Sequence, residues 1–211
     1  MKFHQRLLLC AAMTVLFLGL AIASASAGRF SYSDTGFRQT FRTISIEANN
    51  QIGVQCEATF EGAFHASTWR KVTGSLVGLI RVARLNNCIE GSANSGATVL
   101  SETLPWHIQY EGFEGTLPNI TSLRFNEVGV SVIARFRSPF GTQVCLIRST
   151  TARPLRAIWR RSGNGEIPSG SLEINPTLPA TGCIYLELAM YAVTSEISRG
   201  ISTERITITL I

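Results

Sequence analysis

The chain has 211 residues, of which 45% are hydrophobic, and a net charge of +5 at pH 7. Residues 1–27 contain two of the 19 basic residues and none of the 14 acidic ones, so the remainder has a net charge of only +3. This mild charge lacks the footprint of a dedicated nucleic-acid-binding protein, and the length suits one domain with a substantial core.

Residues 1–27 are predicted to be a cleavable signal peptide. A positive start, an uncharged run over residues 7–22 and small residues at Ala25 and Ala27 are typical of a leader cut before Gly28. A retained membrane anchor is the alternative, but the small-residue exit and the missing basic stop-transfer cluster favour removal. We therefore expect a secreted or cell-surface protein that meets a membrane only through its signal peptide.

Strand-like patterning dominates the rest of the chain. Residues 28–40 are polar and contain Gly and Ser, so they are predicted to form a flexible N-terminal extension, and residues 41–211 a single β domain. Apolar and polar residues alternate over residues 52–60, which is typical of a half-buried strand.

Further alternation follows along the chain. A second alternating face runs over residues 128–136, a third over residues 184–190, and residues 205–211 form a terminal strand rich in β-branched residues. Weaker strand candidates are residues 41–48, 76–85, 97–103, 106–113, 119–126, 142–149, 153–161 and 171–175. About ten short strands separated by turns predict an all-β fold, either an antiparallel β-sandwich or a partly open barrel.

Four cysteines follow the signal peptide, and export predicts that they form two disulfides. Cys56 and Cys88 lie symmetrically about a predicted strand reversal near residue 72. The other two lie symmetrically about a Ser-Gly-Asn-Gly turn at residues 162–165. The sequence therefore predicts the pairs Cys56–Cys88 and Cys145–Cys183, although three pairings are possible. A zinc site or a nucleophilic cysteine is disfavoured, since no pair has two-residue metal spacing.

Two stretches are distinctive: residues 56–65 (CEATFEGAFH) and residues 103–121 (TLPWHIQYEGFEGTLPNIT). Together they resemble a group of uncharacterised exported proteins of similar size from high-GC Gram-positive bacteria. The resemblance implies an exported, disulfide-bearing β domain. It implies no known activity and no catalytic residue.

The second stretch has both a structural and a functional interpretation. Its two strands are expected to join at residues 112–115, with Trp106 and Tyr110 facing the core and His107 on the opposite face. The functional alternative places these aromatic side chains on the surface, where they would stack on a sugar ring of a glycan ligand.

A basic run surrounds Trp159 over residues 153–161. On a strand, Trp159 would point inward while Arg156 and Arg160 point outward. A cationic strip of this kind would bind a polyanion such as a cell-wall polymer. The alternative is an edge strand whose charges prevent edge-to-edge aggregation.

Residues for acid–base chemistry are scarce. Asp34 is the only Asp, and only His65 and His107 remain after the signal peptide. The sequence has no G-x-S-x-G nucleophile elbow, no H-E-x-x-H metal motif and no phosphate-binding P-loop. We therefore expect a non-enzymatic structural or binding domain with no cofactor. Two alternatives remain, a secreted hydrolase that uses Glu and His residues and a small membrane β-barrel.

Overall fold

The computed structural model describes residues 28–49, 51–89, 96–138, 140–200 and 202–211, so the predicted signal peptide lies outside the described residues. The described residues form sixteen strands and one 3-10 helix, Ser101–Thr103. The predicted all-β class is confirmed, as are both predicted disulfides, Cys56–Cys88 and Cys145–Cys183. Among these residues, no helix has the length and apolar character needed to cross a bilayer.

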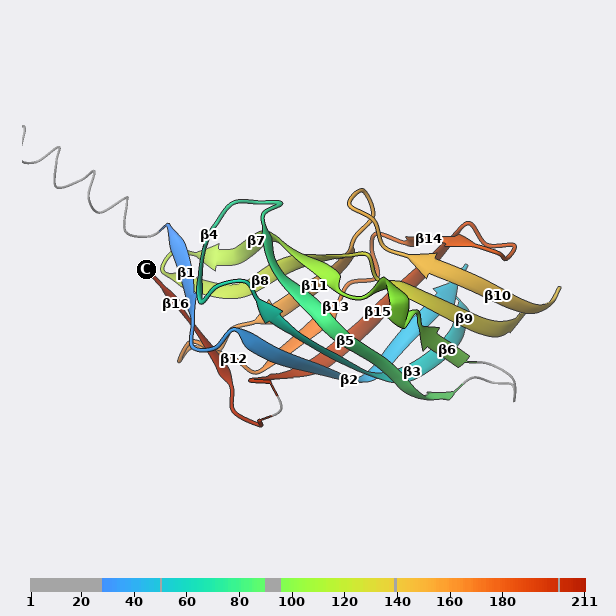
Figure 1. Ribbon diagram of the computed structural model, residues 1–211, viewed down its shortest axis with the longest axis horizontal. Coiled ribbons are helices and arrows are strands. Elements are labelled where there is room, and N and C mark those ends of the chain that lie inside the picture. Colours follow the sequence, from blue (N-terminus) through green and yellow to red (C-terminus); the bar gives the residue numbers. More distant parts are fainter. Residues whose placement is uncertain (1–27, 50, 90–95, 139, 201) are drawn as a thin grey trace, which may run out of the picture.

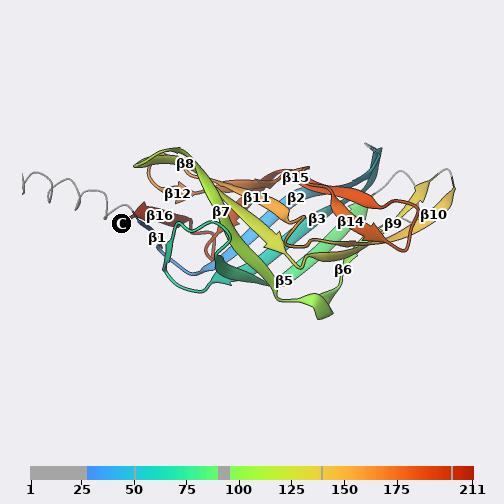
Figure 2. The same cartoon turned by 90° about the horizontal axis from the view of Figure 1, so that it is seen from above.

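Eight antiparallel strands form a closed ring. In ring order they are β13 (Ser169–Leu172), β11 (Leu155–Arg160), β8 (Asn119–Val128), β7 (Trp106–Thr116), β5 (Leu76–Ile89), β3 (Gln51–Phe64), β2 (Gly36–Ala48) and β15 (Glu187–Ser198). The ring closes because β13 also pairs with β15. Of the two predicted architectures, this arrangement corresponds to the barrel, in a closed form (Figures 1 and 2).

Aromatic side chains fill the interior of the ring. Phe37 on β2 contacts Trp159 on β11 with ring centroids 5.2 Å apart, and Phe60 on β3 contacts Trp106 on β7 at 5.7 Å. An eight-stranded barrel is just wide enough for side chains from its walls to meet in this way. The interior is therefore a packed core.

A buried hydrogen-bond chain lies beside the closure of the ring. The Trp159 Nε1–H group donates to Oε1 of Gln39 at 3.2 Å, and Nε2 of Gln39 donates to Oγ of Ser195 at 2.8 Å. Gln39 is only 1% exposed. Since buried polar groups are costly when unpaired, this chain fixes how β11, β2 and β15 sit around the closure.

Two smaller sheets lie at opposite ends of the ring (Figure 1). The terminal sheet contains β12 (Glu166–Ile167), β16 (Ile206–Leu210), β1 (Arg29–Tyr32) and β4 (Thr68–Arg70). The distal sheet contains β14 (Leu178–Thr181), β10 (Gly141–Arg148), β9 (Ser131–Ser138) and β6 (Gly96–Val99), and it continues from β15 through β14.

The structure corrects the prediction that residues 28–40 form a flexible extension. These residues form β1 and the start of β2, and Phe30, Tyr32 and Phe37 are buried. Phe30 contacts Tyr110 of the ring at a centroid distance of 5.9 Å, so the terminal sheet packs against this end of the barrel. The turn at residues 33–35 breaks the alternation, which hides the strands in the sequence.

Three other local predictions are wrong in detail. The β7–β8 turn lies at Leu117 and Pro118, beyond the predicted residues 112–115, because β7 continues through Gly112 and Gly115, which pair with Arg124 and Ile120 of β8 next to register shifts in the ladder. The predicted face over residues 128–136 is broken at Gly129, which has a φ of 89°. In the predicted face over residues 184–190, the first part is an exposed loop, and β15 begins at Glu187.

Gly62 marks the closest approach between β3 and β5. A Cβ atom there would lie 2.1 Å from the carbonyl oxygen of Leu79 and 2.5 Å from Cζ of Phe37. We expect Gly62→Ala to lower the free energy of unfolding by about 2–3 kcal/mol, since overpacking forces the two strands apart. Urea unfolding measures this loss. Gly112→Ala on β7 is the matched control, because nothing lies within 4 Å of its Cβ position. Equal effects of the two substitutions would contradict the steric argument.

Candidate functional site

The three aromatic residues considered for ligand binding lie in the core. Trp106, Tyr110 and Trp159 are buried, so none offers a ring face for stacking at the surface. The Trp106 Nε1–H group donates to Oγ1 of Thr103 at 3.0 Å. Burial raises the pKa of the Tyr110 phenol to about 12, which keeps it neutral. The core interpretation of these side chains is confirmed.

The two histidines that follow the signal peptide are exposed and lie apart. His65 follows β3, and its backbone N–H donates to the Val77 carbonyl of β5 at 2.9 Å. His107 on β7 pairs with Leu79 of the same strand β5. Since β5 separates them, they are about two strand spacings apart, or roughly 10 Å. They do not converge on one site.

The basic run around Trp159 lies on a central strand, which corrects the predicted edge strand. β11 pairs with β13 on one side and with β8 on the other. Arg156 and Arg160 point outward, as predicted. Nε of Arg156 lies 3.5 Å from Oε1 of Glu111, Arg153 forms an ion pair with Glu187, and Nε of Arg161 donates to the Ile208 carbonyl. Two of the four arginines in the strip, Arg153 and Arg156, are therefore paired with carboxylates of the same chain.

A second ion pair extends this polar surface on β7 and β8. Arg124 donates to Oε1 of Glu114 at 2.6 Å, and Oγ of Ser122 donates to Oε2 at 3.0 Å. These hydrogen bonds, from Ser122 and then from Arg124, lower the pKa of the Glu114 carboxyl. A carboxylate held ionised in this way, as Glu114 is, makes a poor general acid.

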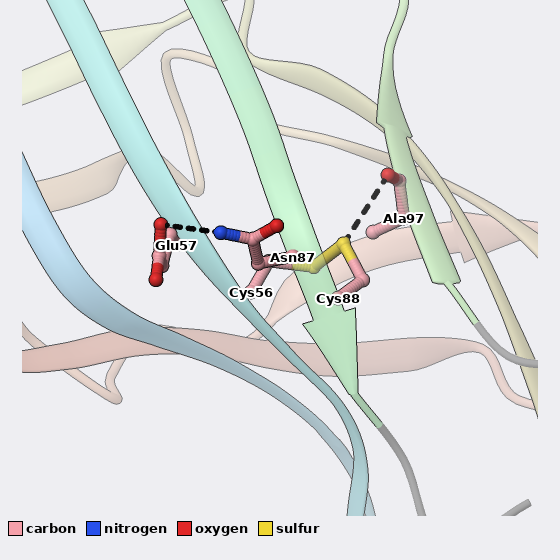
Figure 3. The surroundings of a disulfide bond; sticks show 5 residues. All are labelled: Cys56, Glu57, Asn87, Cys88 and Ala97. Atoms are coloured by element: carbon pink, nitrogen blue, oxygen red, sulfur yellow. Dashed lines mark hydrogen bonds between the residues drawn. A yellow bond between two sulfur atoms is a disulfide. The ribbon is translucent and has the colours of Figure 1, made fainter.

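Two shallow hollows lie on the ring, and each contains a carboxylate that is already bound by a side chain of the same chain. One, of about 220 Å³, lies beside the Cys56–Cys88 disulfide and includes Glu57, which accepts a hydrogen bond from Nδ2 of Asn87 at 2.9 Å (Figure 3). The other, of about 230 Å³, includes Glu61. Its Oε1 atom forms an ion pair with Nη2 of Arg38 at 2.6 Å. Neither His65 nor His107 lines either hollow.

Glu127 on β8 is a buried carboxyl that sequence reasoning missed. It is 3% exposed and pairs in register with Ile108 of β7 and Leu155 of β11. Its Oε2 atom has no hydrogen-bond partner. Burial in this apolar setting raises its pKa to about 8. The signal was present, since Leu123, Phe125 and Glu127 share one alternating phase.

The strongest candidate for a binding surface lies at the far end of the distal sheet. We define the distal tip as the strands β9 and β10 together with Phe140 and the loop of residues 182–186. Large apolar side chains are exposed there, namely Phe140, Val144, Ile184 and Leu186. The Cys145–Cys183 disulfide and a 3.2 Å hydrogen bond from the Ile184 N–H to Oε1 of Gln143 hold the loop against β10.

The distal tip is also basic. Arg135, Arg137 and Arg148 lie on its two strands, and the sequence has no Asp or Glu between Glu127 and Glu166. Within the described part of the chain, Arg135 and Arg148 have no ion-pair partner. This acid-free stretch is visible in the sequence, but only the fold shows which of its arginines stay unpaired.

The described residues contain no group of three or more His, Cys, Asp or Glu side chains that could hold a metal ion. The two disulfides are compatible with a location outside the cytoplasm. In comparisons with known proteins, no family model matches the chain, and neither a curated protein nor a solved structure matches it.

Proposed function

We propose that this chain is exported and acts at the cell surface or in the medium as a non-catalytic domain that binds an anionic component of the cell envelope. Phosphate or carboxylate groups of an acidic cell-wall polymer, or of a lipid, would supply the binding chemistry. The two disulfides support a site of action outside the cytoplasm.

One observation carries the proposal: Arg135 and Arg148 are exposed, lie on one acid-free sheet and have no ion-pair partner among the described residues. Arginine is well suited to bind phosphate and carboxylate groups through its planar guanidinium. Elsewhere, Arg38, Arg124, Arg153, Arg156 and Arg199 all form ion pairs with carboxylates of the same chain. Exposed arginines without an ion pair also occur on the ring and the terminal sheet, for example Arg42 and Arg70, but the distal sheet is the one whose strands contain no Asp or Glu. We therefore place the anion-binding surface there.

A pair of charge-matched variants tests the proposal. The protein, purified after export, is applied to polyphosphate-coated beads, anionic vesicles and uncoated beads at several salt concentrations. We expect Arg135→Gln/Arg148→Gln to bind the anionic probes about tenfold more weakly than the unmodified protein. Arg42→Gln/Arg70→Gln, which removes the same charge from β2 and β4, should change binding by less than about twofold. Loss of binding to the same extent in both variants, or no binding to any anionic probe, would refute the proposal.

A further inference from the structure

The register of β9 and β10 places both unpaired arginines of the distal sheet on the same side. Paired residues project from one face of a sheet, and every second residue along a strand shares that face. Phe136 and Cys145 point to the opposite, buried face. We define the outer face by three successive cross-strand pairs, Arg135–Val144, Ile133–Leu146 and Ser131–Arg148.

The positive charge of the outer face is not neutralised by the adjoining strand of the ring. Glu187 on β15 pairs with Pro179 of β14, next to β10, but it already forms an ion pair with Arg153 and accepts a 2.6 Å hydrogen bond from Oγ1 of Thr177. Among the residues that the structure describes, no carboxylate forms an ion pair with either arginine of the outer face. Both guanidinium groups are therefore available to an external anion.

The two arginines stand far apart along the outer face. Arg148 lies four positions beyond Val144, the partner of Arg135, so the two backbone positions are about 14 Å apart at the usual rise of a strand. Side chains of a strand stand roughly perpendicular to the sheet, so the guanidinium groups keep about this separation. A single phosphate or carboxylate group therefore contacts one of these arginines and not both.

The surface between the arginines is uncharged and continuous across the sheet. Ile133 and Leu146 pair there and are partly buried. On either side of them, Thr98 of β6 pairs with Ile133, and Thr181 of β14 pairs with Leu146. The two threonines are exposed, and their hydroxyl groups can donate hydrogen bonds to ligand oxygens. An extended anionic ligand can therefore cross from one arginine to the other without meeting a carboxylate of these strands.

We propose that the outer face binds one linear polyanion, which lies along β10 and contacts Arg135 and Arg148 through two separate anionic groups. This inference rests on the proposed function and names its ligand as an acidic polymer. Two-point attachment strengthens binding, because the second contact forms within a complex that already exists. An anionic bilayer fits less well, since electrostatic binding to lipid uses clusters of about four to eight basic residues, whereas the described strands of this sheet hold Arg135, Arg137 and Arg148.

Competition between phosphates of different length tests the inference. The protein, purified after export, is bound to polyphosphate-coated beads and displaced with orthophosphate, pyrophosphate or long-chain polyphosphate at equal total phosphate. We expect the long chain to be at least about tenfold more effective per phosphate, because only the long chain spans both arginines. Arg135→Gln and Arg148→Gln should each remove most of this advantage. Each should also weaken bead binding nearly as much as the double variant, since one remaining arginine is no better than the other exposed arginines of the chain.

The matched control is Arg42→Gln, which removes one exposed arginine from β2 on the ring and should leave the advantage of the long chain intact. Equal potency of pyrophosphate and long-chain polyphosphate per phosphate would overturn the inference and leave the proposed function standing. The same holds if the effects of the two substitutions multiply in the double variant, because the arginines would then act independently. Tighter binding to anionic vesicles than to polyphosphate would overturn the polymer in favour of a bilayer. Failure to bind any anionic probe would overturn both proposals.

Discussion

Replacing Glu127 with glutamine should raise the free energy of unfolding in alkaline solution by on the order of 5 kcal/mol and leave it unchanged in acid. The cause is burial, which raises the pKa of this carboxyl from 4.5 to about 8. Below about pH 4.5 the group is protonated in both the folded and the unfolded chain. As the pH rises toward about 8, only the unfolded chain releases the proton, so the native state loses stability progressively. Above that pH the loss is complete.

Urea unfolding across this pH range measures the effect as the difference between the unmodified protein and Glu127→Gln. The difference isolates Glu127, because the titration of every other group is common to both proteins. Glu196→Gln, at an exposed position on β15, is the matched control and should show no such divergence. A constant difference between Glu127→Gln and the unmodified protein from acid to alkaline pH would show that Glu127 is not held protonated by burial.

Removing the Cys145–Cys183 disulfide should lower the free energy of unfolding by roughly 3–4 kcal/mol. The bridge spans 38 residues of sequence, and its loss allows the unfolded chain many more conformations. The double variant Cys145→Ala/Cys183→Ala avoids a free thiol and keeps both positions small. The Cys56–Cys88 bridge spans 32 residues, so its double alanine variant should lose a similar amount.

The two disulfide variants differ in where the native state loosens. Cys56 and Cys88 lie on β3 and β5, which pair along most of their length. The loop of residues 182–186 has few other attachments to β10, so its backbone amides should exchange with solvent much faster in Cys145→Ala/Cys183→Ala. Native-state hydrogen exchange by mass spectrometry measures this. Equal exchange of that loop in both variants would contradict the role of the Cys145–Cys183 disulfide in holding it. A fall of less than about 1 kcal/mol in the free energy of unfolding of Cys145→Ala/Cys183→Ala would contradict the predicted stabilisation.

The strands were predictable wherever their alternation is uninterrupted. Residues 52–60 and 106–113 fall within β3 and β7 because each side of a strand meets one environment along its whole length. The disulfide Cys145–Cys183 was predicted correctly, but the predicted hairpin between its two cysteines is only partly right. The turn at residues 162–165 joins β11 to β12, while β10 and β14 pair around it with the same centre of symmetry.

The closure of the ring and the pairing of the arginines could not be predicted because both depend on contacts between distant residues. β13 pairs with β15 through residues such as Ser169 and Glu196. Arg156 is neutralised by Glu111, 45 positions earlier, whereas Arg135 and Arg148 find no such partner. Sequence position distinguishes none of these arginines from the others. The fold shows that Arg153 and Arg156 of the predicted basic strip are paired with carboxylates, whereas Arg135 and Arg148 on the distal sheet are not.

Closure of the ring also determines which parts of the molecule can unfold locally. Each of the eight ring strands has a ladder on both sides, so detaching any one of them breaks two sets of hydrogen bonds at once. Among the described strands, β4, β6 and β12 have only one neighbour. Fraying is therefore confined to the two end sheets, while the barrel between them opens cooperatively or not at all.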